Sequence, residues 1–314
     1  MELLVLREGV HRLPTTAYVE ALDERLSDHE VRHARTPREE RDLVPSADVV
    51  TGPRIDPALV DAAEDLRLFA CVYAGYGHLP MATLEEAGVA VTSATGVHAP
   101  NAAEHVVGGI LTFSRRLHEA AGREYWQPGD PDELAGSTVT VVGLGAIGEA
   151  IVERLRPFGV TTVGVRRRPE EGGPTDEVFG PEALHEALFR TDYLVLCCPL
   201  TEETRGLVGE AELATLPADS VLVNVARGEV VDTDALVGTL RRGRLGGAFL
   251  DVTDPEPLPD DHPLWEFDDV VVTPHTAGAT PEYYERLADI VADNVRRLDD
   301  DGPLRNRVDA AENS

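Results

Sequence analysis

The chain has 314 residues, enough for two domains, and 57 acidic residues against 28 basic ones give it a formal net charge of −29. Every one of those basic residues is an arginine, since the sequence contains no lysine. A charge of this sign and size argues against nucleic acid and anionic membranes as partners. Because no run of about 18 apolar residues occurs, the sequence also predicts no membrane span.

This charge would destabilise a compact state in dilute buffer through self-repulsion. About 1 M salt would screen the repulsion, because the Debye length then falls to roughly 3 Å. We therefore interpret the composition as the salt adaptation of a cytoplasmic protein. The alternative is an acidic protein without salt adaptation, in which codon bias favours arginine over lysine. The three cysteines, Cys71, Cys197 and Cys198, lie in apolar stretches without metal-ligand spacing, which predicts buried thiols and no metal site.

The first hundred residues alternate short apolar runs with helical patterns. Alternation of this kind predicts parallel βαβ units. The predicted strands of this part include ELLVL, ADVVT, LRLFACVY and VAVTSAT. The predicted helices include TAYVEALDERL and ATLEEAG.

A change of pattern follows at Asn101. Apolar residues at three- and four-residue steps predict one long helix from Asn101 to Glu124. A second alternating series then predicts a doubly wound, dinucleotide-binding domain. Its expected strands are VTVVG, TTVGVR, YLVLC, SVLVNV, GAFLDV and VVVTP. A last helix, EYYERLADIVADNVRRLDDD, is expected to pack back on the first domain, and the polar tail RVDAAENS is expected to be frayed.

The segment GLGAIG stands between a predicted strand and a predicted helix, as a phosphate-binding turn requires. Gly143 permits the tight turn, Gly145 lets the backbone approach a pyrophosphate, and Gly148 lets helix and strand pack closely. The helix that begins at Ala146 and Ile147 offers N–H groups and a partial positive charge to the phosphates. A glycine turn without a ligand is the alternative, and the strand and helix around the motif disfavour it.

Three arginines, Arg166, Arg167 and Arg168, end the next predicted strand. About 20 residues beyond such a turn, an acidic side chain usually binds the ribose 2′-hydroxyl of NAD. A guanidinium cannot accept a hydrogen bond from that hydroxyl, but it can bind a 2′-phosphate with two hydrogen bonds. The arginines therefore favour NADP(H), with NAD(H) still possible. The alternative is a solvated strand end in a chain whose only long base is arginine.

Reactive side chains follow three later strands, where sites are built in α/β sheets. These are Arg227 in NVARGEVVD, Asp251 and Glu256 in LDVTDPEPLP, and His275 in TPHTAGAT. Together with GLGAIG, CCPLTEETRGLVG, HPLWEFDDVVV and the closing GPLRN, these segments resemble the D-isomer-specific 2-hydroxyacid dehydrogenases. The resemblance covers most of residues 96–306.

The resemblance implies an α/β fold of two flavodoxin- or Rossmann-like domains, with doubly wound parallel sheets and a cleft between them. Residues 1–100 and 283–314 would form a discontinuous substrate-binding domain, and residues 101–282 a dinucleotide-binding domain. The family also implies a homodimer that pairs partly through the long helix, and a small 2-keto or 2-hydroxy acid as substrate. Hinges near Val97–Pro100 and Gly278–Pro281 would let the domains close and exclude water.

The resemblance further implies a catalytic set of Arg227, Glu256 and His275. Arg227 can bind the carboxylate and carbonyl of a 2-keto acid with its rigid fork of donors. His275 can donate a proton to the carbonyl oxygen when the hydride arrives, and Glu256 can fix the tautomer of His275. Backbone N–H groups of Ala74 and Gly75 are expected to bind the substrate carboxylate.

Two regions carry less specific expectations. Family members usually have an acidic residue where Gly77 stands, so the loop is expected to be looser or shaped for another side chain. An ordinary βα turn is the alternative for residues 73–77. Asp251 is expected to hold the nicotinamide carboxamide or to make a structural hydrogen bond. The remaining predicted cofactor contacts are Cys198, Pro199, Thr204, Val225, Ala226, Ala277 and Gly278.

The sequence therefore predicts an NADP(H)-preferring D-2-hydroxyacid dehydrogenase that works as a 2-keto acid reductase. A cofactor-sensing binding protein of the same fold, without turnover, is the alternative from another functional class. A formate dehydrogenase is disfavoured, because Gln is expected there in place of Glu256. Oxidation of phosphite is a weaker possibility still.

Overall fold

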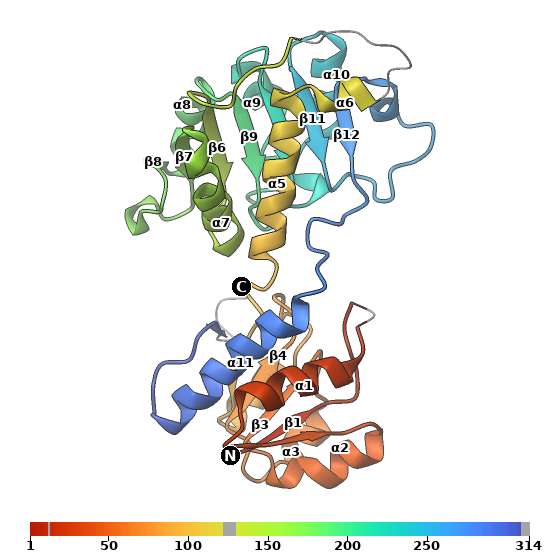
Figure 1. The fold of residues 1–314 in the computed structure, drawn as a ribbon, viewed down its shortest axis with the longest axis vertical. Coiled ribbons are helices and arrows are strands. Elements are labelled where there is room, and N and C mark those ends of the chain that lie inside the picture. The colour runs from red at the N-terminus through yellow and green to blue at the C-terminus, as the bar shows by residue number, and fades with distance from the viewer. Residues whose placement is uncertain (12, 122–129, 309–314) are drawn as a thin grey trace. The chain divides into compact units, whose positions relative to one another are not determined.

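The computed structural model describes residues 1–11, 13–121 and 130–308. The chain separates into two compact units: unit 1, formed by Met1–Val97 and Thr280–Ser314, and unit 2, formed by His98–Ala279 (Figure 1). The chain passes between the units twice, a few residues before each of the boundaries expected from the sequence. In the part of the chain that the structure describes, no helix is both long enough and apolar enough to cross a membrane.

Unit 1 is built on one sheet in the order β13-β5-β4-β3-β1-β2. Without β13 this is the flavodoxin-like order 2-1-3-4-5, and all of its pairs are parallel. Strands β3 and β4 are buried along their whole length, as the central strands of a sheet covered on both faces must be. The strands are β1 Glu2–Val5, β2 Glu30–His33, β3 Val49–Gly52, β4 Leu68–Cys71, β5 Ala90–Thr92 and β13 Arg307–Val308.

The last helix of the chain, α11 (Tyr283–Asp299), belongs to unit 1 and packs on α1 (Thr15–Arg25). Tyr284 stacks on the buried ring of Tyr18 with 5.0 Å between the ring centroids. The hydroxyl of Tyr283 donates to the carbonyl of Val72, at the end of β4. The buried aromatic face of α11 thus explains why the chain returns to its first unit. The other helices of this unit are α2 Pro37–Leu43, α3 Pro57–Ala62 and α4 Met81–Glu86.

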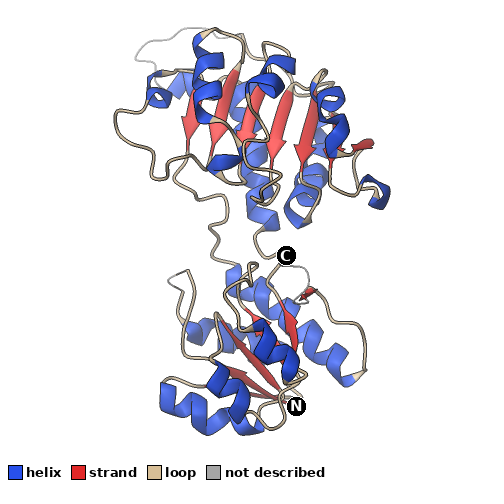
Figure 2. Ribbon diagram, turned by 180° about the vertical axis from the view of Figure 1, so that it is seen from behind, coloured by secondary structure: helices blue, strands red, loops and turns tan. Residues whose placement is uncertain are grey.

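Unit 2 is built on a wholly parallel sheet in the order β12-β11-β10-β9-β6-β7-β8 (Figure 2). Strands β7 and β8 are added on one side of β6, and strands β9 to β12 are added on the other side. This is the doubly wound order with one further strand at the edge. This confirms the predicted fold class. The strands are β6 Thr138–Val142, β7 Thr161–Val165, β8 Glu177–Phe179, β9 Tyr193–Leu196, β10 Val221–Asn224, β11 Gly247–Leu250 and β12 Val270–Val272.

Helices cover both faces of this sheet, and successive strand residues enter different cores. In β9, Val195 packs in the core that contains residues of α5, whereas Leu194 packs in the core on the other face. The helices are α5 Ala99–Ser114, α6 Leu117–Ala121, α7 Ala146–Leu155, α8 Leu184–Leu188, α9 Glu210–Thr215 and α10 Thr233–Arg241. The carboxyl ends of β6 and β9 therefore meet at the point where ligands bind in sheets of this type.

Two sequence-based expectations are wrong in detail. The long helix expected over Asn101–Glu124 is two helices, α5 and α6, because Arg116 adopts a left-handed backbone with φ of 49°. Residues 122–124 of that expectation lie outside the described residues. The tail expected to be frayed begins with a strand, since Arg307 and Val308 pair antiparallel with β5.

Candidate active site

The glycine turn between β6 and α7 has a backbone that larger residues could not adopt. Gly143 has φ of 104°, and a Cβ there would lie 2.7 Å from the backbone nitrogen of Cys198. A Cβ on Gly148 would lie 2.1 Å from the carbonyl oxygen of Gly143. These two glycines are therefore required for the turn to pack against α7 and the end of β9.

Gly145 differs from them, because a Cβ there would meet no atom within 4 Å. The backbone at Gly145 thus borders open space at the start of α7, where the N–H groups of Ala146 and Ile147 begin the helix. The first N–H groups of a helix have no partner within the helix and carry a partial positive charge. An approachable backbone at a helix N-terminus fits the pyrophosphate of a dinucleotide.

The arginine run starts next to this turn, because the N–H of Gly143 donates to the carbonyl of Val165 at 2.8 Å. Arg166 follows Val165 directly, and its Nη1 donates to the carbonyl of Gly172 at 2.7 Å. Nη2 of Arg166 pairs with Glu171, and Nε of Arg168 lies 2.8 Å from the same carboxylate. Arg167 is exposed. Cationic side chains therefore lie at the end of β7, the position that contacts the adenosine ribose in dinucleotide-binding sheets of this type.

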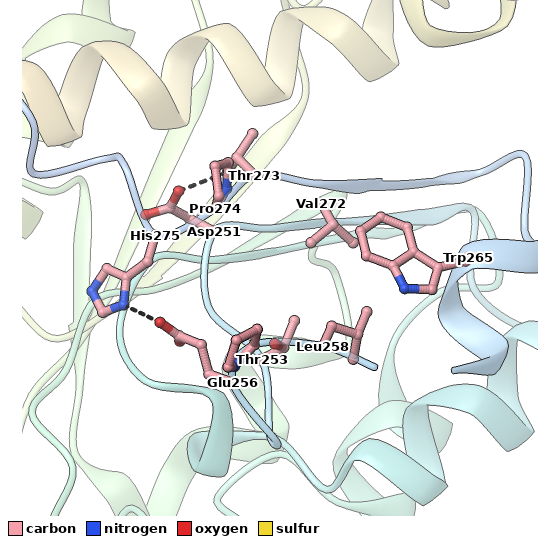
Figure 3. A pocket seen from close by; sticks show the side chains of 10 residues that line it. Asp251, Thr253, Glu256, Leu258, Trp265, Val272, Thr273, Pro274 and His275 are labelled. Atoms are coloured by element: carbon pink, nitrogen blue, oxygen red, sulfur yellow. Dashed lines mark hydrogen bonds and ion pairs between the residues drawn. The ribbon is translucent and has the colours of Figure 1, made fainter. Parts of the chain in front are cut away.

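His275 and Glu256 meet in unit 2 beyond the ends of two neighbouring strands, β11 and β12. Nδ1 of His275 lies 2.7 Å from Oε1 of Glu256 (Figure 3). Their side chains are 45% and 43% exposed, so a substrate could reach the imidazole. With Nδ1 engaged by the carboxylate, Nε2 is the ring nitrogen left to act on a ligand.

The backbone of His275 is strained, with φ of 52°. A left-handed conformation is uncommon for a residue other than glycine and costs of order 1–3 kcal/mol. The N–H of His275 donates to the carbonyl of Asp251 at 2.9 Å, which helps to hold this conformation. Strain that the surroundings maintain is typical of residues whose side-chain position matters for function.

The carboxylate of Asp251 anchors the loop that carries His275. It accepts hydrogen bonds from the hydroxyl of Thr273 at 2.7 Å and from the N–H groups of Thr276 and Ala277 at 2.8 Å each. His105 Nε2 lies 3.4 Å away. Burial favours the neutral acid, but these hydrogen bonds outweigh burial and hold the pKa of Asp251 well below its ordinary value. Asp251 was expected either to hold the nicotinamide carboxamide or to make a structural hydrogen bond. The contacts described here are structural hydrogen bonds.

Arg227 follows β10, on a turn that the buried side chain of Asn224 holds. Oδ1 of Asn224 accepts from the N–H of Ala226, and its Nδ2 donates to the carbonyl of Arg227, both at 3.0 Å. The next residue, Gly228, touches the loop of Glu256, since a Cβ there would lie 2.0 Å from the carbonyl carbon of Thr253. Arg227 itself is exposed. The loops of Arg227 and Glu256 are therefore packed together.

A cavity of about 420 Å³ adjoins His275 and Glu256 (Figure 3). Leu258, Trp265 and Val272 supply apolar wall, and Asp251 and Thr273 also line the cavity. Trp265 is 52% exposed, and its indole N–H donates to the carbonyl of Pro259 at 2.9 Å. This open, largely apolar space lies beside the exposed imidazole.

The other predicted cofactor contacts fall in several environments. The hydroxyl of Thr204 donates to the carbonyl of Pro199 at 2.6 Å, so this hydroxyl serves its own loop. Cys198, Ala226 and Ala277 are buried, whereas Val225 and Gly278 are partly exposed. Burial raises the pKa of the Cys198 thiol, which keeps the group neutral. In unit 1, Ala74 and Gly75 follow β4 on an exposed turn, and a Cβ on Gly75 would meet open space.

Four positioning residues were not predicted: Asn101, His105, Asn224 and Thr273. Nδ2 of Asn101 donates to the carbonyl of Ala277 at 2.7 Å, and His105 Nε2 lies 3.1 Å from the hydroxyl of Thr273. Asn101 and His105 are four residues apart and so share one face of α5. Two polar residues at this spacing on a largely buried helix are a signal that the sequence did contain.

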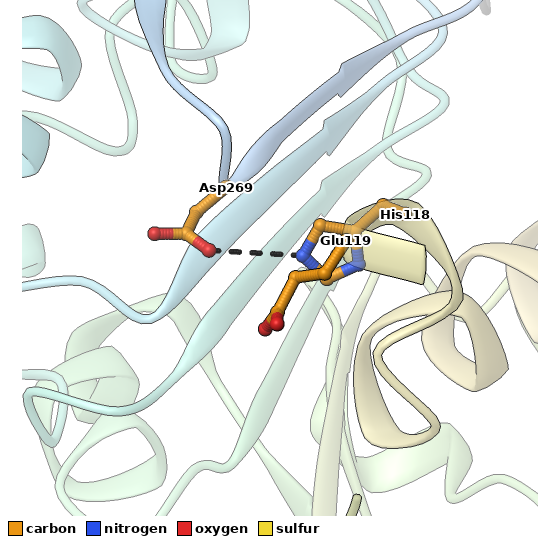
Figure 4. Close-up of side chains that lie close together, drawn as sticks. All are labelled: His118, Glu119 and Asp269. Carbon is orange, nitrogen blue, oxygen red and sulfur yellow. Dashed lines mark ion pairs between the residues drawn. The ribbon is translucent and has the colours of Figure 1, made fainter. Parts of the chain in front are cut away.

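A third group of polar side chains, His118, Glu119 and Asp269, lies at the opposite end of β12 from His275 (Figure 4). Among the described residues it is the group whose ligand atoms could hold a metal ion, all lying within 4.8 Å of one another. Nη1 of Arg116 donates to Glu119 at 2.6 Å, so a guanidinium already balances one of the carboxylates. A divalent cation would have to compete with Arg116.

Known proteins resemble this chain over most of its length. A family model for the D-isomer specific 2-hydroxyacid dehydrogenase, NAD binding domain, matches residues 107–277. The glyoxylate reductase of Thermofilum pendens is 38% identical over 255 residues, which cover 77% of this chain and 74% of that protein. The glyoxylate reductase/hydroxypyruvate reductase of Mus musculus is 35% identical over 254 residues, 77% of each chain.

A similar solved structure is that of a D-isomer specific 2-hydroxyacid dehydrogenase from Xanthobacter autotrophicus Py2 in complex with NADPH and MES. It has a TM-score of 0.77 and 30% sequence identity, with 99% of both chains covered. The match to the family model and the identity to curated relatives agree with the doubly wound fold and its glycine turn. The chain belongs to the D-isomer-specific 2-hydroxyacid dehydrogenase family of NAD(P)-dependent oxidoreductases.

Proposed function

We propose that this protein is an NADP(H)-preferring D-2-hydroxyacid dehydrogenase that reduces small 2-keto acids, with Arg227, Glu256 and His275 as its catalytic residues. The observation that carries the proposal is the 2.7 Å contact between His275 Nδ1 and the carboxylate of Glu256. It leaves Nε2 of a half-exposed imidazole next to a cavity, and the loop of Glu256 packs against that of Arg227. Glyoxylate and hydroxypyruvate are the first substrates to test, because relatives are named for their reduction.

Each residue has a defined task in this reaction. Arg227 binds the carboxylate and the carbonyl oxygen of the substrate with its rigid fork of donors. When bound, the reduced nicotinamide supplies a hydride to the carbonyl carbon. His275 donates the proton on Nε2 to the carbonyl oxygen, which would otherwise carry the developing negative charge. Glu256 holds the ring through Nδ1 and stabilises the imidazolium that donates this proton.

A 2-keto acid panel tests the proposal against the alternative of a cofactor-sensing protein without turnover. Purified protein is mixed with NADPH or NADH and with small, branched or aromatic 2-keto acids in molar KCl, and the absorbance of the reduced nicotinamide is followed. We expect oxidation with at least one small 2-keto acid. Cofactor binding without oxidation by any acid of the panel would support the binding protein instead.

The preference for NADP(H) rests on the cationic end of β7, and it gives a testable substitution. Replacing Arg166 by Asp should lower the NADPH/NADH ratio of kcat/KM by about 10- to 100-fold, because a charge-assisted contact with the 2′-phosphate is replaced by repulsion. Arg38→Asp is the matched control, since Arg38 lies on α2 of unit 1 and is 86% exposed. An unchanged ratio in the Arg166 variant would remove the support for NADP(H).

The proposed enzyme works as a homodimer in a saline cytoplasm, and its charge predicts how salt affects stability. With a formal net charge of −29, the folded state is expected to gain stability as KCl rises from dilute to molar, because screening weakens self-repulsion. A thermal melt across this range measures the effect. A melting temperature that falls with added KCl would count against salt adaptation.

A further inference from the structure

The arginines that would bind a 2′-phosphate already share an anionic partner. The two carboxylate oxygens of Glu171 are divided between them, Oε2 pairing with Nη2 of Arg166 and Oε1 lying 2.8 Å from Nε of Arg168. Glu171 ends the short 3-10 helix Pro169–Glu171, and the left-handed Gly172 follows with φ of 65°. Because the carbonyl of Gly172 accepts from Nη1 of Arg166, this segment folds back over the guanidinium.

We propose that Glu171 is a specificity-determining residue that competes with the 2′-phosphate of NADPH for Arg166 and Arg168. This inference rests on the proposed function, because it assumes that these arginines read the ribose. Carboxylate and phosphate oxygens use the same guanidinium donors, so one must leave before the other can bind. A phosphate monoester carries close to two negative charges against one for the carboxylate, which lets the phosphate displace Glu171.

Glu171 has the opposite relation to NADH. The 2′-hydroxyl of that cofactor cannot displace a carboxylate from two guanidinium groups, but it can donate a hydrogen bond to a carboxylate oxygen. Although arginines end β7 in this protein, Glu171, five residues after Arg166, still offers an acidic side chain to the ribose. Glu171 would therefore weaken NADPH binding and maintain NADH binding, so that both cofactors remain usable.

The exposure of the three side chains sets the size of the effect. Arg166 is 20% exposed, Glu171 34% and Arg168 63%, so solvent screens the pairs and a ligand can reach them. Partly exposed ion pairs are individually weak. Loss of both ion pairs, through removal of the charge of Glu171, should therefore tighten NADPH binding by about three- to tenfold rather than by orders of magnitude.

The test compares Glu171→Gln with Glu170→Gln. Glu170 is the preceding residue and is exposed, so its substitution removes the same charge one position away and controls for the general reduction in negative charge. Calorimetric titration in molar KCl gives Kd for NADPH, NADH and adenosine 2′,5′-bisphosphate. We expect Glu171→Gln to lower Kd for NADPH and the bisphosphate by about three- to tenfold and to leave Kd for NADH unchanged or higher.

The control should change each Kd by less than about twofold. Equal changes for NADPH and NADH in Glu171→Gln, or weaker NADPH binding, would overturn the inference, because Glu171 would then merely support the loop. A melt of each variant reports folding, and Glu171→Ala repeats the test if the Gln variant is unstable. The titration needs no turnover: failure to reduce any 2-keto acid would refute the proposed function, whereas unaltered cofactor selectivity would refute this inference.

Discussion

Replacing His275 by Asn is expected to lower kcat by about 10²- to 10⁴-fold, the contribution typical of a general acid. Asn is the informative substitution, because residue 275 has φ of 52° and Asn tolerates the left-handed conformation better than Ala does. The variant should therefore keep its fold and bind cofactor normally while it loses the proton donor. Steady-state kinetics with NADPH and the best 2-keto acid of the panel measure the loss.

His185→Asn is the matched control for this experiment. His185 on α8 also lies beside a carboxylate, with its Nε2 3.3 Å from Glu212, and it is 57% exposed. Its replacement should leave kcat within about twofold, because a surface pair of this kind contributes little. Near-normal turnover in the His275 variant would show that another group donates the proton.

Replacing Asp251 by Asn is expected to reduce the free energy of unfolding by about 3 kcal/mol near neutral pH. The carboxylate is 1% exposed and accepts hydrogen bonds from Thr273, Thr276 and Ala277. An amide would present N–H groups to at least one of these donors and leave it unsatisfied. Denaturant unfolding in molar KCl measures the loss, and kcat should fall too, since this network holds the loop of His275.

The pH dependence of this effect has a definite sign. Because the folded state lowers the pKa of Asp251, its contribution to stability is complete above the unfolded pKa of about 3.9 and is lost as pH falls toward the folded pKa. The difference in the free energy of unfolding between wild type and Asp251→Asn should therefore be constant near neutral pH and should become smaller below about pH 4. The exposed residue Asp268 provides the control, Asp268→Asn, which should cost less than about 0.5 kcal/mol. A gap independent of pH would contradict the anchoring role.

The central strands of both sheets and the edge strand β12 could be predicted from the sequence, whereas the other three edge strands could not. Strands β2, β8 and β13 lie at or near sheet edges, and they contain charged residues such as Arg32, Glu177 and Arg307. An edge strand is partly solvated, so it needs no continuous apolar run that a pattern could reveal. The break between α5 and α6 was missed for a different reason, because it depends on the backbone of one residue, Arg116.

The candidate site shows the same limit at the level of side chains. Order along the chain and family resemblance were enough to place Glu256 and His275 at neighbouring strand ends. They could not show that the carboxylate of Asp251 accepts hydrogen bonds from the loop of His275, because this depends on where individual N–H groups point. Nor could they show that Glu171 contacts the arginines, since this depends on the short 3-10 helix Pro169–Glu171 and on the hydrogen bond from Arg166 to the carbonyl of Gly172.

The most direct test of the proposed chemistry is a single-turnover measurement on the wild-type protein with NADPH already bound. Glyoxylate or hydroxypyruvate is added in molar KCl, and the absorbance of the reduced nicotinamide is recorded beside that of His275→Asn. We predict rapid oxidation of the bound NADPH in the wild type and oxidation slower by at least about 10²-fold in the variant. Equal rates in the two proteins, or no oxidation of bound NADPH by any 2-keto acid, would contradict catalysis by the His275–Glu256 pair.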